Sequence, residues 1–492
     1  MKRILLAVLG LLGILAAVLV VNTLRVPKPA AAAGQSESLA IDAPAAAARL
    51  AGAIRFQTVS VQSGAPIDTA AFLGLHEYLM QTYPAAHAAM RREVQGSLSL
   101  LYTWQGADTT AAPIVLMGHL DVVPVTEENR AEWLHAPFGG DVAEGFVWGR
   151  GTLDDKSTVV AILEAVESMA AAGLKPARTV YLAFGHDEEV GGRYGARVLV
   201  DTLVARGVKP ALVIDEGGFL ASDVVPGLKG MAAIVGVAEK GYISLKLTSR
   251  SAGGHSSMPP TRTSVGALSA ALDRLVQQPF PASLDGPTEK MVAAVAPWVP
   301  FAPRLALANL WLTEPLVMKA LQKSPMGNAL TRTTTAPTML NAGVKDNVLP
   351  PEATAVVNFR IRPGETRESV IARVRDIVND TMIDVSPRDS ATTDPSGVSR
   401  TDGPAYHLIE RTIRAVVPDK PVPVVPYLVM GGTDAKYWSA HSDQVYRFLA
   451  APISASDVPR VHGVNERIGV EAFGTAVEFF ARLLRGLDQL SQ

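Results

Sequence analysis

Cysteine is absent from this chain of 492 residues. Its absence excludes disulfides, a thiol nucleophile and thiolate metal ligands, so any metal site must be built from histidine and carboxylate side chains. The sequence also has no excess of one charge: 45 Lys and Arg residues stand against 47 Asp and Glu residues, and the formal net charge is −2. A nucleic-acid partner therefore has no electrostatic support. The apolar fraction of 48% is enough for buried cores in a globular chain of about three domains.

One long apolar run lies at the N-terminus, where residues 4–21 are uncharged and follow Lys2 and Arg3. As a helix this run would span about 27 Å, close to the ~30 Å core of a bilayer and longer than most signal-peptide cores. We interpret it as a retained anchor, although a cleaved signal is an alternative because the stretch 30-AAAAG-34 resembles a cleavage site. A buried core helix fits the basic start poorly. The rest of the chain is predicted to be extracytoplasmic, either membrane-anchored or, after cleavage, secreted or periplasmic.

Beyond a Pro/Ala-rich linker, short apolar runs alternate with helical patterns. The runs at 113–123, 178–187 and 211–218 are rich in β-forming residues and end in polar ones, whereas 157–173 has helical spacing with Ser157 as N-cap and Gly173 just past its end. This alternation predicts an α/β fold: a mixed, mostly parallel sheet with flanking helices. Ligand groups gather at the carboxyl ends of such strands, where these runs place their acids.

The pattern changes from about residue 239. Segments 241–250 and 352–364 alternate as half-exposed strands, and 264–278 is an amphipathic helix, which predicts a smaller α+β domain inserted into the first. A stretch rich in Pro, Trp, Leu and Met at 279–336 is longer than an ordinary connection, and we expect it to be a substrate-facing cap or a partner surface. The helix predicted at 469–487 closes the chain.

These changes divide the chain into an N-terminal membrane or signal segment, a linker, two arms of a catalytic domain and an inserted lid. The predicted ranges are 1–25 for the segment, 26–40 for the linker, 41–238 for the first arm, 239–390 for the lid with its insertion at 279–336, and 391–492 for the second arm.

Candidate chemistry begins with His119 and Asp121, two residues apart at the end of a predicted strand. Both would project from the same face, so Asp121 can orient the imidazole while His119 holds a metal. A strand-end His beside a helix-capping acid is the plain alternative. Asp154 and Asp155 follow a Gly-Arg-Gly turn; one could cap a helix, and one could bridge two cations, because a bridge needs both oxygens of one carboxylate.

Paired acids recur at the next strand end, where Glu188 and Glu189 precede two glycines. A solvated acidic loop is one explanation. In the other, one Glu holds metal while its neighbour accepts a proton from water. Asp215 ends a further strand, and His462, in a loop more than two hundred residues later, is the natural second imidazole.

The order and wording of these motifs resemble the M20 family of metallopeptidases over nearly all of the chain after the linker. The resemblance implies a zinc exopeptidase-like catalytic domain with two zinc ions, for which Co²⁺ or Mn²⁺ could substitute. It makes Asp121 the orienting acid, Glu188 the general base and Asp154 the bridge, often followed by a cis peptide. The five ligands that it implies are His119, Asp154, Glu189, Asp215 and His462.

The inserted domain resembles the family's lid. His255 matches the lid histidine that stabilises the oxyanion, and Asn347 and Arg360 match substrate-binding positions, with Arg360 suited to holding a carboxylate. The turn containing Gly432 resembles the family's carboxylate-binding loop. A surface His, a strand-edge Arg and an ordinary Gly turn are the structural alternatives. In dimeric relatives the lid histidine serves a partner's site, so a homodimer through the lid is one arrangement that the resemblance leaves open.

The N-terminal segment, the linker and the enlarged lid resemble the carboxypeptidase S branch, which includes secreted N-acyl-amino-acid hydrolases. This implies hydrolysis of an amide next to a free carboxylate, in a small peptide or an N-acyl amino acid. An aminoacylase, a deacetylase or a di/tripeptidase on the same scaffold is the main alternative. A non-catalytic relative is disfavoured because every ligand and the base are present.

Overall fold

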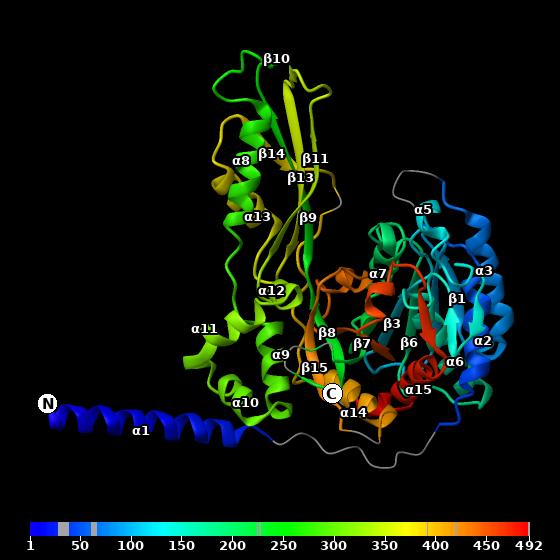
Figure 1. The fold of residues 1–492 in the computed structure, drawn as a ribbon. Helices are drawn as coiled ribbons and strands as arrows, with labels where there is room; N and C mark the ends of the chain where they lie inside the picture. The colour runs from blue at the N-terminus through cyan, green and yellow to red at the C-terminus, as the bar shows by residue number, and fades with distance from the viewer. Residues whose placement is uncertain are drawn as a thin grey trace.

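The computed structural model describes residues 1–27, 39–60, 66–223, 225, 228–390, 392–418 and 421–490. An α/β catalytic domain carries a tall, separate lid, and a long N-terminal helix extends from the base of the molecule (Figure 1). The predicted cleavage stretch at 30–34 and most of the predicted linker lie outside the described residues.

The catalytic domain is built on an eight-stranded sheet. Its strands, in spatial order, are β1 (Arg91–Gln95), β2 (Ser99–Trp104), β6 (Val180–Gly185), β3 (Ile114–His119), β7 (Leu212–Ser222), β16 (Val445–Ser454), β8 (Met231–Glu239) and β15 (Val424–Val429). The run from β6 through β16 is parallel, as is the pair β8 and β15, whereas β1 and β2 join antiparallel at one edge. The predicted mixed, mostly parallel sheet with flanking helices is therefore confirmed.

Both faces of this sheet are covered, because successive strand residues point to opposite sides. Ile114 and Leu116 enter one core, and Val115 and Met117 enter the other. The first core lies under the helices α2 (Ala43–Ile54), α6 (Lys156–Ala171), α14 (Pro404–Val416) and α15 (Val470–Arg485). The second lies under α7 (Ala196–Ala205) and a short 3₁₀ helix, η3 (Asp434–Trp438).

Helix α6 begins at Lys156, with Asp155 in place of Ser157 as N-cap, so the helix starts two residues earlier than predicted. The end of α6 agrees with the prediction, because Gly173 lies just past it. Gly173 has a φ of +70°, a left-handed conformation that glycine adopts without steric cost. The smaller elements around it are α3 (Thr69–Thr82), α4 (Pro84–Ala89), α5 (Glu127–Arg130), β4 (Asp141–Ala143), β5 (Phe146–Trp148) and β17 (Arg467–Gly469). Because β17 pairs with β5, the C-terminal arm is joined directly to the first arm.

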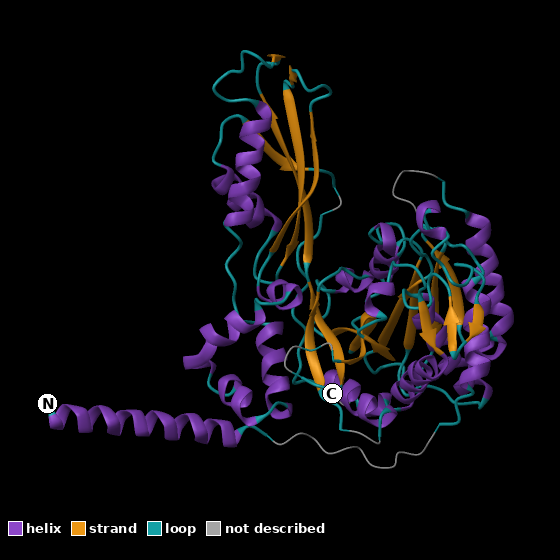
Figure 2. Ribbon diagram, in the orientation of Figure 1, coloured by secondary structure: helices purple, strands orange, loops and turns teal. Residues whose placement is uncertain are grey.

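The lid contains a four-stranded antiparallel sheet in the order β11 (Thr334–Ala342), β13 (Glu352–Ile361), β9 (Gly241–Arg250), β14 (Ile383–Pro387). Two helices, α8 (Ser264–Gln277) and α13 (Arg367–Val378), cover one face and share its apolar core (Figure 2). A two-stranded ribbon of β10 (Gly254–His255) and β12 (Val348–Leu349) lies at the end of the lid farthest from the catalytic sheet (Figure 1).

The apolar stretch predicted as an insertion folds into the helices α9 (Pro287–Val295), α10 (Phe301–Leu307), α11 (Leu310–Leu321) and α12 (Pro325–Thr331). Its buried side chains form a core with β8 and β15. These helices therefore cover the edge of the catalytic sheet at the root of the lid.

The N-terminal run forms one helix, α1 (Lys2–Arg25), with a mean hydropathy of 3.2 over its most apolar window, none of which is buried in the protein. Its length and composition suit a membrane span or a signal sequence.

Candidate metal centre

Asp154 lies between two imidazoles that are distant in the sequence. One of its carboxylate oxygens is 2.8 Å from His119 Nε2, and the other is 2.9 Å from His462 Nε2. His119 ends β3, Asp154 lies in the turn before α6, and His462 lies in the loop after β16. The peptide bond from Asp154 to Asp155 is cis, as the family resemblance implies. One carboxylate thus offers an oxygen to each of two neighbouring sites.

Two further carboxylates complete these sites. Glu189 Oε2 is 3.2 Å from His462 Nε2, and Glu216 Oε1 is 3.7 Å from His119 Nε2. Each set, one imidazole and two carboxylates that include Asp154, has its donor atoms within 4.8 Å of one another. The first set contains Glu216, which the sequence prediction did not name, and not the neighbouring Asp215, which it did.

The direction of side chains along β7 explains why only one of these two adjacent acids faces Asp154. Adjacent residues of a strand point to opposite sides, so Asp215 and Glu216 cannot both face Asp154. Asp215 points toward η3, where its carboxylate accepts a 2.7 Å hydrogen bond from the backbone N–H of Ala435. Glu216 points to the side where α6 begins. Asp215 therefore supports the first turn of η3.

Asp121 connects the first imidazole to the paired glutamates. The His119 Nδ1 atom lies 2.9 Å from the Asp121 backbone oxygen and 3.4 Å from a carboxylate oxygen. The same carboxylate accepts hydrogen bonds from the backbone N–H groups of Glu188 and Glu189, both at 3.1 Å, and from Ser60 Oγ at 2.8 Å. Burial alone would raise the pKa of Asp121, but the His119 imidazole holds it below its usual value. A fully buried, ionised Asp121 can orient His119 as predicted.

Glu188 lies three residues after the end of β6, at the start of the 3₁₀ helix η1 (Glu188–Val190). Burial raises the pKa of its carboxyl to about 8, while the Lys436 ammonium and the His119 imidazole oppose the shift. A carboxyl with such a pKa has the basicity that proton transfer at neutral pH requires.

The cluster is crowded with buried negative charge. Burial and the charges of Asp154 and Asp155 raise the pKa of Glu216 well above its ordinary value. The Oε1 atom of Glu189 is buried without a hydrogen-bond partner. Divalent cations would relieve this repulsion and engage this atom, and mixed His and carboxylate donors suit zinc. The residues present therefore fit two adjacent cations that share Asp154.

Arg150 and Glu466 hold the two halves of the cluster together, and the sequence analysis assigned them no role. Both are buried and form an ion pair. Glu466 also accepts hydrogen bonds from the backbone N–H groups of Gly151, Leu153 and Asp154, at 3.0, 2.8 and 3.2 Å. Arg150 donates to the backbone oxygen of His462 at 3.0 Å. Arg150 lies in the same motif as Asp154, and Glu466 lies in the same motif as His462. This was the feature of the sequence from which their role could have been inferred.

The predicted lid residues lie apart from this cluster. His255 and Asn347 are exposed at the far end of the lid, where the Ser256 N–H donates to the Asn347 backbone oxygen (Figure 1). Arg360 lies on the inner strand β13, near the end of the lid sheet that is closest to the catalytic domain. Its guanidinium is 4.9 Å from the centre of the Tyr242 ring. Gly432 is exposed in the turn that leads to η3. The structure thus brings His119, Asp154, Glu189 and His462 together and places His255 and Asn347 at the far end of the lid, while Gly432 belongs to the second catalytic arm.

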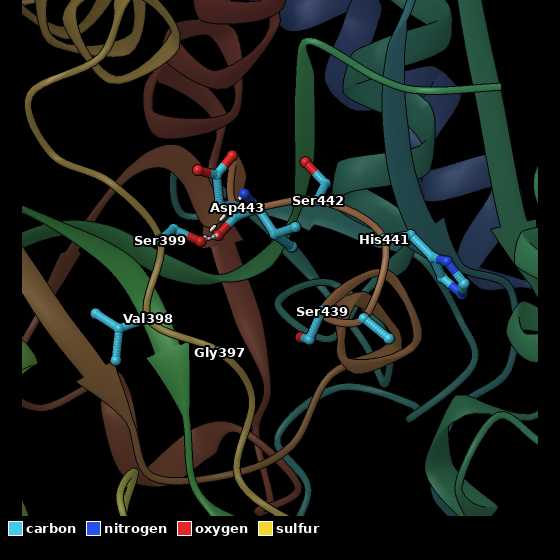
Figure 3. A pocket seen from close by; sticks show the side chains of 9 residues that line it. Gly397, Val398, Ser399, Ser439, His441, Ser442 and Asp443 are labelled. Carbon is cyan, nitrogen blue, oxygen red and sulfur yellow. Dashed lines mark hydrogen bonds between the residues drawn. The ribbon is translucent and has the colours of Figure 1, made fainter.

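A cavity of about 390 Å³ opens at a different place, between residues 397–399 and 439–445 (Figure 3). Its polar lining includes Ser399, His441 and Asp443, and Ser399 is engaged with the Val445 backbone. None of the residues lining it belongs to the metal-binding cluster, so we assign this cavity no part in the chemistry.

Comparison with known proteins agrees with this geometry. Residues 115–486 match the family model described as Peptidase family M20/M25/M40. The chain is 38% identical over 486 residues to the N-fatty-acyl-amino acid synthase/hydrolase PM20D1 of Xenopus tropicalis, covering 97% of this chain and 93% of that protein. It is 37% identical over 447 residues to the probable carboxypeptidase S-like 2 of Dictyostelium discoideum, covering 90% of this chain and 85% of that protein.

Solved structures show the same fold. The M20 family metallo-carboxypeptidase Sso-CP2 of Sulfolobus solfataricus superposes with a TM-score of 0.66 at 17% identity, covering 89% of this chain and 98% of that one. Human carnosine dipeptidase 1 gives a TM-score of 0.62 at 16% identity, covering 91% and 96%.

Proposed function

The chain belongs to peptidase family M20/M25/M40, as a hydrolase of the carboxypeptidase S-like type, and from that membership we propose that it hydrolyses an amide next to a free carboxylate with two zinc ions. The arrangement that supports this most directly is Asp154 with one oxygen at His119 and the other at His462. We assign His119, Asp154 and Glu216 to one cation and Asp154, Glu189 and His462 to the other.

Bound zinc would supply Lewis-acid activation of water and of the substrate carbonyl. Glu188 takes a proton from the attacking water as the new C–O bond forms. It then gives that proton to the amide nitrogen as the C–N bond breaks, so the products are a carboxylic acid and an amine. Asp121 holds the Glu188 backbone in place through its carboxylate, and the same carboxylate steadies His119.

We assign recognition of the substrate carboxylate to Arg360 and the turn at Gly432, while Asn347, which lies beside His255 at the far end of the lid, would offer a further polar contact to the site of a second copy. An Arg suits a carboxylate because its guanidinium can donate two parallel hydrogen bonds. The N-acyl amino acids named for the Xenopus relative and the peptides implied for the Dictyostelium relative share this free carboxylate. We favour N-acyl amino acids, because the chain covers nearly the whole of the former relative.

We propose that His255 completes the site of a second copy. It is exposed at the far end of the lid, whereas the metal-binding cluster lies in the catalytic domain (Figure 1). Strand β11 is an edge of the lid sheet, and its Met339 and Leu340 side chains are 45% and 62% exposed. An unpaired edge with exposed apolar residues is suited to pairing between two copies.

We also propose that α1 is a retained anchor with the catalytic domain on the extracytoplasmic side. Its apolar length suits a bilayer, and Lys2 and Arg3 mark the cytoplasmic end.

The experiment for the proposed reaction is a substrate panel measured before and after chelation. We expect hydrolysis of an N-dodecanoyl amino acid, much weaker hydrolysis of its C-terminal amide, and loss of activity on chelation that zinc restores. Activity that survives complete metal removal would contradict the metal mechanism. A strong preference for small polar dipeptides would instead overturn the N-acyl assignment alone.

A further inference from the structure

An exposed apolar surface lies on the helices α10 and α11 at the root of the lid. Phe301, Trp311, Leu312 and Leu316 are 51%, 62%, 45% and 67% exposed. Leu312 and Leu316 share one face of α11 and Trp311 lies beside that face, while Thr313 and Val317 on the other side are buried. We call these four residues the α10–α11 face. Apolar side chains grouped on one surface usually mark an interaction site.

This face adjoins the end of the predicted membrane span. Asn309, the fully buried N-cap of α11, accepts a 2.9 Å hydrogen bond from Asn22 Nδ2 and donates at 3.1 Å to the Leu19 backbone oxygen. Leu19 lies within the last turn of the apolar run, and Asn22 lies just beyond it. A bilayer that contains residues 4–21 therefore ends at about the level of Asn309. Trp311 follows two residues later, and tryptophan is enriched at that depth of a membrane.

The charges on α11 suit the same boundary. Lys319, in the last turn of α11, and Lys323, two residues past its end, follow Leu312 and Leu316 on the exposed side. The exposed side chains in the first half of α11 are apolar apart from Glu314, and lysines follow them. An apolar stretch followed by lysines is a pattern of helices that lie in the membrane interface, where lysines reach the headgroups.

We propose that the α10–α11 face inserts into the leaflet from which α1 emerges, so that the bilayer covers it. The inference rests on the proposed anchor. Its consequence for the enzyme follows from packing: Val317 of α11 shares a core with the edge strand β15 of the catalytic sheet and with its neighbour β8. Docking of this face would hold the catalytic domain in one orientation against the membrane, where amphiphilic N-acyl substrates concentrate.

The test uses the full chain in lipid nanodiscs whose phospholipids carry bromine near the start of the acyl chains. Bromine quenches tryptophan within contact range, and Trp311 is the exposed tryptophan among the six of this chain. We expect partial quenching of the wild-type emission. Trp311→Phe should abolish the quenchable part, and the matched control Trp298→Phe, which alters a partly buried tryptophan, should keep it.

Carbonate extraction of the same membranes separates the two proposals. Retention of the chain with quenching that depends on Trp311 supports docking. Retention without such quenching contradicts docking but is consistent with the anchor. Cross-linking between copies through the α10–α11 face would show that a second chain, and not the bilayer, covers it. Release of the chain by carbonate contradicts the anchor, and docking with it, but leaves the proposed reaction untouched.

Discussion

At the scale of single residues, local sequence motifs identified most of the side chains that lie around Asp154. His119, Asp154, Glu189 and His462 were predicted from local motifs, and the structure places their side chains together. For the fifth ligand the motif contains two adjacent acids, Asp215 and Glu216, and sequence order alone does not say which faces the cluster. That choice depends on the strand's orientation toward α6 and η3, which is set by the surrounding fold.

Substitutions at these adjacent acids should separate ligand from support. We expect Glu216→Gln to lose about one of the two zinc equivalents, because it removes a charged donor from one cation site. Asp215→Asn should keep both equivalents, since its carboxylate holds the Ala435 N–H. Metal analysis of the dialysed proteins measures this directly. Metal loss in Asp215→Asn with retention in Glu216→Gln would restore Asp215 as the ligand.

Whole strands and helices were predictable where periodicity was strong. The runs that form β3, β6, β9 and β13 and the helices α6, α8 and α15 follow their apolar spacing closely, whereas β7 does not end at Asp215 as predicted but continues to Ser222. The packing of the 279–336 stretch could not be predicted, because its helices pack on β8 and β15, which are far away in sequence. The direction of the lid was also beyond the sequence, so the position of His255 relative to the metal-binding cluster came from the structure.

Mixed subunits test whether the lid acts on a second copy. His255→Ala and Glu188→Gln should each be nearly inactive alone. When co-expressed, half of the dimers would be mixed and would carry one site with both residues intact, so about a quarter of wild-type activity should return in a symmetric dimer. The control is Leu340→Lys in both chains, which should block pairing at the β11 edge and prevent recovery. If mixed dimers form and stay inactive, His255 does not act across subunits.

At the scale of the molecule, the cluster forms only when both arms of the catalytic domain meet. Glu466 and Arg150 make that connection, and β17 pairs with β5 beside it. The sequence supplied both charged residues but not their pairing, since a contact across more than three hundred residues leaves no local pattern. The hydrogen bond between Asn22 and Asn309 joins the N-terminal helix to the root of the lid across 287 residues, and it likewise leaves no local pattern in the sequence.

Removing the charge of Glu466 should loosen this junction. Glu466→Gln leaves the buried Arg150 without its ionic partner, a change that typically costs about 3–5 kcal/mol. We expect a lower Tm together with a zinc affinity weakened by about 10- to 100-fold, because the Asp154 turn and the His462 loop lose their common support. The matched control is Glu410→Gln, whose partly exposed pair with Arg414 should contribute less than about 1 kcal/mol. Equal effects of the two substitutions on Tm and zinc affinity would contradict this role.

The assignment of a metal-supported proton transfer to Glu188 is best tested by measuring turnover and zinc content together in Glu188→Gln. This substitution keeps the size of the side chain and removes its basicity. We predict that kcat falls by about 10²- to 10⁴-fold while two zinc equivalents remain bound. Near-normal turnover in a pure sample, or loss of zinc in proportion to activity, would contradict Glu188 as the base.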